Sequence, residues 1–384
     1  MSDHSKFFKK YTLNNKVEVP SLLAVAPMTL FGSNPDGTIS EEERNFYKQR
    51  ATGIGLYILG ATCVSLEGLA FDNQPRAFDD KDIPSNKERV KIIKDQGALA
   101  INQIHHGGCL GLKRVSGVPP MAVSAEVFNK GLEKKGELND ETKAIELSDK
   151  DIKRIIDDFA KATEISIKAG YDGIEIHGAN NYLLQQFYSG YYNKRKDDWG
   201  GSLEKRMRFP LEVVDACCKI RDKYKKPEFI IGYRLSPEEP FDDGITMTET
   251  LALVRELLKK PLQFIHVSQS KFFQEARRGE GAGTPRLKLI HDELKGKMAL
   301  IGVGGLFSNE DLNKALDSRY ADFIGVARAL MLNKDLGILL KEGKGDKINL
   351  EIDPDHPEKF DMPKMLWNMS IQEGSCLGFK IKKK

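Results

Sequence analysis

Eight short apolar segments alternate with helical patterns along this chain of 384 residues, and the alternation limits the folds it can adopt. Most of these segments are apolar throughout instead of alternating with polar residues. This is typical of parallel strands that are covered on both faces. The predicted strands are Leu22–Met28, Gly55–Val64, Leu99–His105, Tyr171–Ala179, Phe229–Ser236, Phe264–Ser270, Met298–Leu306 and Ala321–Ala327.

Amphipathic patterns between these strands predict helices, and capping residues support several of them. Ser148 precedes one pattern and Gly170 closes it, while Ser308 with Asp311 three residues later resembles a capping box. The predicted helices are Glu41–Ala51, Asn86–Asp95, Asp149–Ala169, Leu203–Tyr224, Thr248–Lys259, Lys288–Leu294, Asn309–Asp317 and Leu330–Leu340.

Eight consecutive βα units predict an α/β fold in which one (β/α)8 TIM barrel closes on itself. An open doubly wound sheet usually carries a glycine-rich loop after its first strand, but here that strand ends Ala26-Pro-Met-Thr29. We expect a single barrel domain over residues 1–384. Residues 107–147 follow the third strand as a lid or small excursion, and residues 342–384 form a C-terminal extension.

The overall composition argues against several classes of function. The 59 basic and 56 acidic residues nearly balance, so no nucleic-acid partner is expected. No segment reaches the roughly 18 apolar residues of a membrane span, and the N-terminus lacks the apolar stretch of a signal peptide. The cysteine count is odd and no pair has Cys-x-x-Cys spacing, so neither a disulfide framework nor a metal site is expected, and the reducing cytoplasm is the expected location. A homo-oligomer remains possible. The cysteines are Cys63, Cys109, Cys217, Cys218 and Cys376.

The last two predicted strands end in a pattern that favours phosphate binding. Gly302-Val-Gly-Gly305 precedes a helix capped at Ser308, which would offer backbone N–H groups and a helix dipole. Strand eight ends with Arg328, a cation beside them. The loops after strands seven and eight often hold phosphate in this fold, although glycines also serve tight turns and an arginine can make a surface ion pair.

The predicted strand ends are poor in carboxylates. They carry histidine, asparagine, glutamine, threonine and arginine, and the exception, Glu175, is expected to alternate away from the mouth. No Ser-His-Asp set, metal cluster or carboxylate pair is evident. The residues suit an organic cofactor or an electron-rich carbonyl group.

The fourth strand ends with a set of residues suited to acting on a carbonyl group. His177 and Asn180, three residues apart in a turn, can donate hydrogen bonds to one oxygen and polarise it. Tyr182 can supply a proton, since its phenol is protonated at neutral pH. The third strand ends with His105 and His106, of which only one can face the mouth.

Several long motifs resemble those of the Old Yellow Enzyme family of NADH:flavin oxidoreductases, which are FMN-dependent ene-reductases. The most specific block is AGYDGIEIHGANNYLLQQFYS at 169–189, continuing NKRKDDWGGSLEKRMRFPLEVV at 193–214. Ala26-Pro-Met-Thr29, Gln103-Ile-His-His-Gly107 and Gly325-Val-Ala-Arg-Ala329 add to the resemblance. It covers nearly the whole predicted barrel, which would make the single domain a flavin oxidoreductase.

The resemblance implies that FMN lies across the barrel mouth, that NADH or NADPH reduces it, and that an α,β-unsaturated carbonyl is the small-molecule substrate. Hydride would pass to the β-carbon of that substrate. His177 and Asn180 would clamp its carbonyl oxygen and Tyr182 would protonate its α-carbon. The residues implied to bind the cofactor are Pro27, Met28, Thr29, Ala61, Gln103, Arg234, Gly304, Gly305, Ala327 and Arg328.

The sequence departs from the family pattern at four positions, and other functions remain open. The departures are Leu30, Cys109, Asn181 and Ala327. The loop 271–283 is expected to be solvated, with Arg277 or Arg278 reaching a nucleotide phosphate as the alternative. Oxidation of an amine by the same flavin barrel is one rival function. A flavin-free aldolase or isomerase is another, although no lysine or carboxylate is found at the mouth to serve it.

Overall fold

Eight parallel strands close into a barrel in the computed structural model, which describes residues 4–372, 374–375 and 377–382. The strands follow one another around the barrel in chain order, and β12 pairs with β3 to close it, with Gly325 beside Ala24. The predicted barrel is confirmed, with each strand inside its predicted range. The strands are β3 (Leu23–Val25), β4 (Leu56–Cys63), β5 (Leu99–His105), β8 (Gly173–Gly178), β9 (Ile230–Leu235), β10 (Phe264–Val267), β11 (Ala299–Gly302) and β12 (Phe323–Val326).

Apolar side chains fill the barrel at the end where its strands begin. Gly232 leaves room for the ring of Phe264, since a Cβ at that position would come within 2.1 Å of it. A hairpin of β1 (Tyr11–Thr12) and β2 (Glu18–Val19) packs on this cluster. The barrel is therefore filled with apolar side chains and covered at this end.

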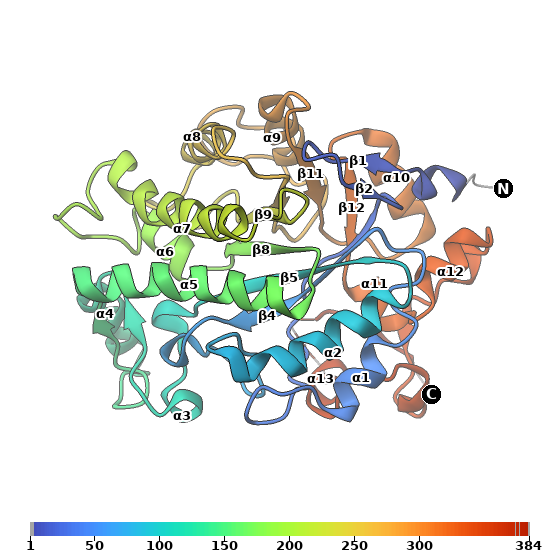
Figure 1. Ribbon diagram of the computed structural model, residues 1–384, viewed down its shortest axis with the longest axis horizontal. Helices are drawn as coiled ribbons and strands as arrows, with labels where there is room; N and C mark the ends of the chain where they lie inside the picture. Colours follow the sequence, from blue (N-terminus) through green and yellow to red (C-terminus); the bar gives the residue numbers. More distant parts are fainter. Residues whose placement is uncertain (1–3, 373, 376, 383–384) are drawn as a thin grey trace.

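Helices surround the strands, as Figure 1 shows. The predicted caps at Ser148 and Ser308 are both present as capping boxes. The outer helices are α1 (Glu41–Tyr47), α2 (Ile83–Lys94), α5 (Asp149–Ala169), α6 (Leu183–Tyr188), α7 (Leu203–Lys223), α8 (Met247–Leu257), α9 (Arg286–Leu294) and α10 (Asn309–Ser318).

One predicted helix, Leu330–Leu340, was wrong, because the structure has α11 (Arg328–Leu332) and α12 (Leu336–Lys341) instead. Asn333 lies between them with an extended backbone. Its side chain donates to the carbonyl oxygens of Ala329 and Asn349, both at 2.9 Å. These bonds to a distant segment stabilise the break, which the local pattern did not indicate.

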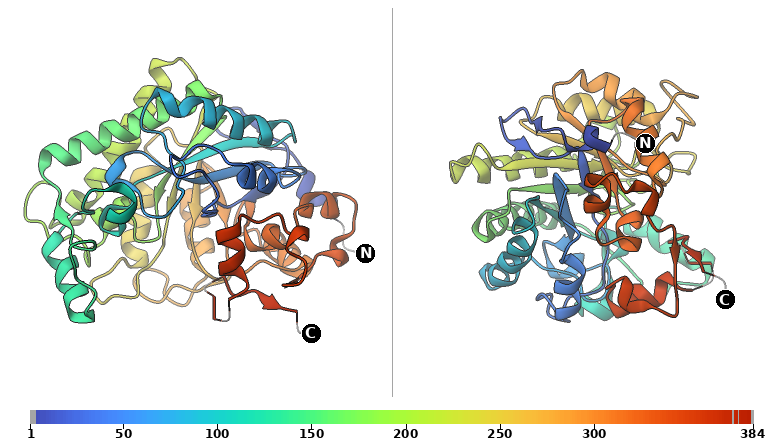
Figure 2. Two further views of the ribbon diagram at one scale, coloured as in Figure 1. Left: turned by 90° about the horizontal axis from the view of Figure 1, so that it is seen from below. Right: turned by 90° about the vertical axis from the view of Figure 1, so that its right-hand side faces the viewer.

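The two segments outside the barrel repeat both have structure of their own. The first runs over residues 107–147 and holds a short parallel pair of strands packed with a helix. Its elements are η4 (Gly108–Leu110), α3 (Lys113–Ser116), β6 (Met121–Ala122), α4 (Ala125–Lys135) and β7 (Ile145–Glu146). The second holds η5 (Gly345–Lys347), β13 (Glu351–Ile352), η6 (Pro357–Lys359), α13 (Lys364–Ser370) and β14 (Lys380–Ile381). Figures 1 and 2 place α4 and this C-terminal segment (red) toward opposite ends of the long axis.

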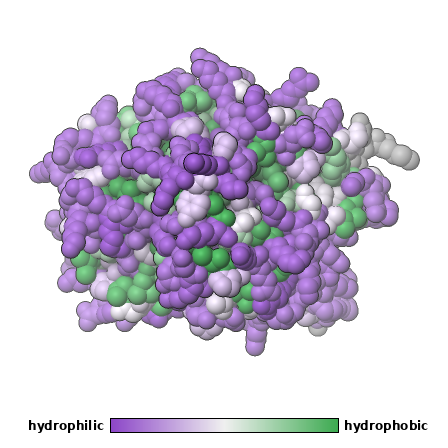
Figure 3. Space-filling model, in the orientation of Figure 1, coloured by the Kyte–Doolittle hydropathy of each residue, from purple (hydrophilic) through white to green (hydrophobic). Residues whose placement is uncertain are grey.

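Among the described residues, no helix is both long and apolar enough to cross a bilayer. Within the same residues, no three His, Cys, Asp or Glu side chains gather as metal ligands. Figure 3 shows a face on which polar side chains predominate and apolar ones occur in small groups. Cys376 lies outside the described residues, and the other four cysteines are buried free thiols.

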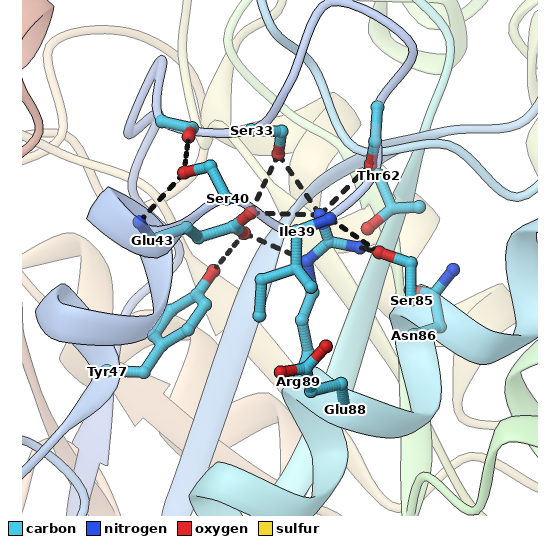
Figure 4. Close-up of polar contacts among 12 residues, drawn as sticks. Ser33, Ile39, Ser40, Glu43, Tyr47, Thr62, Ser85, Asn86, Glu88 and Arg89 are labelled. Atoms are coloured by element: carbon cyan, nitrogen blue, oxygen red, sulfur yellow. Dashed lines mark hydrogen bonds and ion pairs between the residues drawn. The ribbon is translucent and has the colours of Figure 1, made fainter.

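A buried ion pair joins α1 to α2, as Figure 4 shows. Arg89 Nε lies 2.9 Å from Glu43 Oε1, and both side chains are only 1% exposed. Glu43 also accepts hydrogen bonds of 2.9 Å from Ser33 and Tyr47. The pair is therefore fully hydrogen-bonded, which offsets much of the cost of removing two charges from water.

Removing the carboxylate of this pair should strongly destabilise the fold. Glu43→Ala leaves the Arg89 guanidinium buried without a counter-charge, so we expect the free energy of unfolding to fall by about 3–5 kcal/mol. Urea denaturation followed by circular dichroism would measure it. Glu126→Ala, which removes an exposed partner of Lys130, is the control and should leave the midpoint unchanged. Equal midpoints for the two variants would contradict the prediction.

Candidate active site

A cavity of about 170 Å³ opens at the carboxyl ends of the strands, where the polar groups gather. Besides six of the residues predicted to bind a cofactor, its lining includes Ser268, Gln269 and the backbone after β11. The six predicted residues are Pro27, Arg234, Gly304, Gly305, Ala327 and Arg328. The remaining four lie at or near the mouth: Met28 and Thr29 are half-buried, whereas Ala61 and Gln103 are buried.

One end of the cavity combines glycine backbone with a cation. Gly304 and Gly305 both have positive φ, +131° and +63°, and a Cβ on Gly304 would come within 2.7 Å of the Phe272 backbone nitrogen. The Arg328 guanidinium lies 4.5 Å from the centre of the Phe307 ring. Glycines that hold the backbone open beside a fixed arginine are suited to binding an anion.

The helix end expected to help bind an anion here already holds a carboxylate. Helix α10 is capped as predicted, but its Asp311 carboxylate accepts hydrogen bonds from the backbone N–H groups of Phe307 and Ser308 at 3.2 and 2.9 Å. Ser308 Oγ in turn accepts from the Asp311 N–H. A carboxylate already occupies this helix end, so an anion here would depend on the glycine backbone and Arg328.

Two buried polar atoms beside the cavity have no partner within the described part of the chain. They are Arg234 Nε, a donor, and Gln269 Oε1, an acceptor. Burial lowers the pKa of Arg234. Leaving such groups unpaired costs about 1–3 kcal/mol each, so a ligand that pairs with them gains affinity. A polar heterocycle with a phosphate tail fits this combination of donor, acceptor, cation and glycine backbone, and FMN is such a molecule.

Three aromatic side chains meet above the strand ends. The ring centre of His105 lies 4.2 Å from that of Tyr182 and 5.4 Å from that of His177, and the last two are 5.2 Å apart. His106 instead turns away, accepting a hydrogen bond from the Gly108 N–H. Only one of the paired histidines faces the mouth, as expected, but which one could not be read from the sequence.

Hydrogen bonds define the protonation of these rings. His177 Nδ1 accepts from the Ala179 N–H at 3.3 Å, so its proton lies on Nε2. Burial holds the pKa of His177 well below its usual value and lowers that of His105 to about 3, so both are neutral. Burial also raises the pKa of Tyr182, which keeps its phenol protonated. The sequence motifs did not indicate Gln74, whose Nε2 donates to His105 Nδ1 at 3.0 Å.

The turn after β8 holds Asn180 and Asn181 in the left-handed region, at φ +59° and +61°. Asparagine tolerates this conformation better than most residues, so Asn181 can stand where the family usually has glycine. Asn180 Oδ1 accepts from Ser268 Oγ at 2.8 Å. This bond leaves the Asn180 amide NH2 as the group that can donate. The sequence places Ser268 at the end of the predicted strand Phe264–Ser270, but it did not indicate this bond, because the two residues are 88 apart in the chain.

One further departure, Ala327, and the loop after β10 also have local explanations. Ala327 has φ −138°, so a methyl group there meets no left-handed strain. Arg278 donates to the carbonyl oxygens of Phe241 and Asp242, both at 2.7 Å, and so it holds the loop to the preceding one. Of the two arginines considered for a nucleotide phosphate, only Arg277 keeps an exposed side chain, 46% accessible.

The expectation that Glu175 points away from the mouth was wrong. Glu175 and His177 are two residues apart on β8, so their side chains point to the same face. Both project into the barrel, and Glu175 bonds to Gln103 and His266 there. Side chains of neighbouring residues in a strand point to opposite faces, whereas those of residues i and i+2 share one face.

A parallel barrel with one end suited to an anion, a buried cation and a neutral histidine–tyrosine group is the arrangement expected of a flavin-dependent oxidoreductase. Comparison with known proteins agrees. The family model described as "NADH:flavin oxidoreductase / NADH oxidase family" matches residues 6–347, and the chain belongs to that family, which includes the Old Yellow Enzymes. It is thus an FMN-dependent enzyme with NADH or NADPH as reductant.

Two relatives and one solved structure illustrate the similarity. A probable NADH-dependent flavin oxidoreductase of Bacillus subtilis (strain 168) is 36% identical, over 98% of this chain and 99% of its own length. The NADH:fumarate oxidoreductase of Klebsiella pneumoniae (strain 342) is 33% identical over 97% of this chain, which spans 40% of that protein. The old yellow enzyme homologue of Zymomonas mobilis shares the fold at 24% identity, with a TM-score of 0.76 over 93% of this chain and 99% of that one.

Proposed function

We propose that this enzyme reduces the carbon–carbon double bond of an α,β-unsaturated carbonyl compound, with His177, Asn180 and Tyr182 acting on the substrate. The observation that carries the proposal is the state of these groups. His177 has its proton on Nε2, Asn180 keeps its NH2 free, and Tyr182 retains its phenolic proton beside His177. Neutral donors of this kind polarise a carbonyl oxygen without transferring a charge to it.

The residues around the cavity would hold FMN in two groups. Gly304, Gly305, Ala327 and Arg328 would hold its phosphate. Pro27, Met28, Thr29, Ala61, Gln103 and Arg234 would hold its ring system, with the Arg234 cation at the edge that becomes electron-rich on reduction. When bound, FMN supplies the hydride that NADH or NADPH provides and that the substrate accepts.

The substrate would be oriented by hydrogen bonds and protonated by the tyrosine. His177 Nε2–H and the Asn180 NH2 would donate to its carbonyl oxygen, which draws electron density from the β-carbon. The Tyr182 hydroxyl would then give its proton to the α-carbon. His105, held by Gln74, packs against the Tyr182 ring and limits its movement.

A substrate panel tests the proposal. The purified enzyme with NADH or NADPH should turn over cyclic and acyclic enones, and phenyl-substituted amines should not be oxidised with an artificial electron acceptor. Turnover of amines in place of enones would favour the oxidative alternative.

We also place the enzyme in the reducing cytoplasm, a setting that the four free buried thiols support.

The arginine at the anion-binding end allows a direct test of the cofactor assignment. Arg328→Ala removes the side-chain cation, so we expect FMN to bind about 10–100-fold more weakly, as loss of a charged hydrogen bond of about 1.5–3 kcal/mol would give. Riboflavin, which lacks the phosphate, should bind both proteins equally. Fluorescence quenching of each flavin by apoprotein measures this. Equal weakening for riboflavin would contradict a phosphate contact.

A further inference from the structure

A fully buried carboxylate lies in the barrel interior next to a residue assigned to the flavin ring. Glu175 Oε1 accepts a hydrogen bond of 2.7 Å from Gln103 Nε2, and its Oε2 lies 2.7 Å from His266 Nδ1. The side chains of Glu175 and His266 are 0% exposed, and Gln103 is 1% exposed. The proposed function assigns no role to this carboxylate.

The carboxylate determines which way the Gln103 amide points. An ionised carboxylate only accepts hydrogen bonds, so Gln103 must turn its NH2 toward Glu175 and its carbonyl oxygen away. That oxygen lies on the side of Gly60, where an ideal Cβ would be 2.9 Å from it and 3.3 Å from the Pro27 side chain. Pro27 lines the cavity. Gln103 therefore presents an acceptor to this side, suited to a ring N–H such as the imide N–H of a flavin.

The same carboxylate determines the tautomer of His266. Nδ1 must carry the proton that faces Glu175, and Nε2 is buried without a partner in the described residues. His266 stands beside Arg234 in the register of β9 and β10. Burial lowers the pKa of His266, so the ring stays neutral and does not cancel the charge of Glu175.

The negative charge of Glu175 partly offsets the positive charge of Arg234. Arg234 is buried and makes no ion pair within 4 Å among the described residues. Glu175 pairs in register with Gly232, two residues before Arg234 on β9, so its charge acts on Arg234 from inside the barrel. A cation at the flavin edge favours the reduced, more negative cofactor, and a carboxylate behind that cation opposes it.

We propose that Glu175 is a positioning residue of the flavin cavity, which orients the Gln103 amide as an acceptor and sets the effective charge of Arg234. The inference rests on the proposed placement of FMN in this cavity. Glu175 would thereby lower the reduction potential of the bound flavin and strengthen binding of its oxidised form, without touching the cofactor itself.

Glu175→Gln removes the charge and nearly preserves the shape. Its single amide oxygen then faces two donors, Gln103 Nε2 and His266 Nδ1, so one must reorient and Gln103 is free to turn its NH2 to the cavity. We expect oxidised FMN to bind at least tenfold more weakly. We also expect the dissociation constant of oxidised FMN, divided by that of reduced FMN, to rise about tenfold. This change equals a midpoint potential about 30 mV higher for a two-electron couple.

The measurements are titration of apoprotein with oxidised FMN and a spectroscopic redox titration of the bound flavin. Glu239→Gln is the matched control, because Glu239 is an equally buried carboxylate that bonds to Gln185 and Ser189 outside the cavity. Its potential should equal that of the wild type. An unchanged potential for Glu175→Gln would overturn the inference, whereas a wild-type protein that binds no FMN would overturn the proposed function itself.

A second variant decides the question even if Glu175→Gln fails to fold. The double variant Glu175→Gln with Gln103→Glu keeps one carboxylate and one amide. The amide introduced at position 175 on β8 can hydrogen-bond both to the carboxylate at position 103 and to His266. The negative charge moves to position 103, nearer the cavity. The potential should therefore fall below that of the wild type, opposite in sign to the single variant. An unchanged or higher potential in the exchange variant would overturn the inference.

Discussion

Replacing Tyr182 by phenylalanine is expected to slow enone reduction by about 10²–10⁴-fold, the usual contribution of a positioned general acid. The ring contacts with His105 and His177 would remain, because only the hydroxyl is lost. Reduction of the flavin by NADH needs no proton from this residue and should keep its rate. Stopped-flow measurement of the two half-reactions separates these outcomes.

Tyr191→Phe is the matched control, since that ring stacks on Phe241 at 3.7 Å and has no proposed role. Its two half-reactions should match the wild type. The raised pKa of Tyr182 also predicts the pH dependence: the phenol keeps its proton through neutral pH, and the rate of enone reduction falls only as pH rises through that pKa. Equal loss of both half-reactions in Tyr182→Phe would contradict the assignment.

Removing the donors to the substrate oxygen should have an effect of similar size. His177→Ala and Asn180→Ala are each expected to slow enone reduction by about 10²–10³-fold, as loss of one donor to a developing oxyanion does. The double variant should lose less than the product, because both donors act on one oxygen. Single-turnover rates with a saturating enone would measure this.

Binding of a simple phenol provides a second measurement for the same residues. Phenol, whose oxygen takes the place of the substrate carbonyl oxygen, should bind more weakly to His177→Ala and to Asn180→Ala than to the wild type. Perturbation of the flavin spectrum during titration would measure its affinity. His291→Ala serves as control, because His291 lines a separate cavity near the N-terminal segment. A clamp variant that loses turnover but binds phenol as tightly as the wild type would show that the oxygen is held elsewhere.

Much of the site could be predicted because it depends on residue type at strand ends. The ends of β8, β9, β11 and β12 carry His177, Arg234, Gly304 and Arg328, and the structure brings these residues to one end of the barrel. Local sequence patterns could not indicate contacts between residues that are far apart in the chain. Asn333, which ends α11, bonds to the backbone of Asn349, and Asp311 occupies the helix end predicted to bind phosphate.

The sequence by itself determined the eight βα units and the chemical groups that reach the mouth, since apolar runs and helix periods are local properties. Only the tertiary structure decided that His105 and not His106 joins Tyr182, and that Glu175 bonds to partners 72 and 91 residues away. The physical reason is barrel closure: it brings strands distant in the chain side by side and turns every second side chain inward. A buried charge must then pair with whatever group lies opposite it.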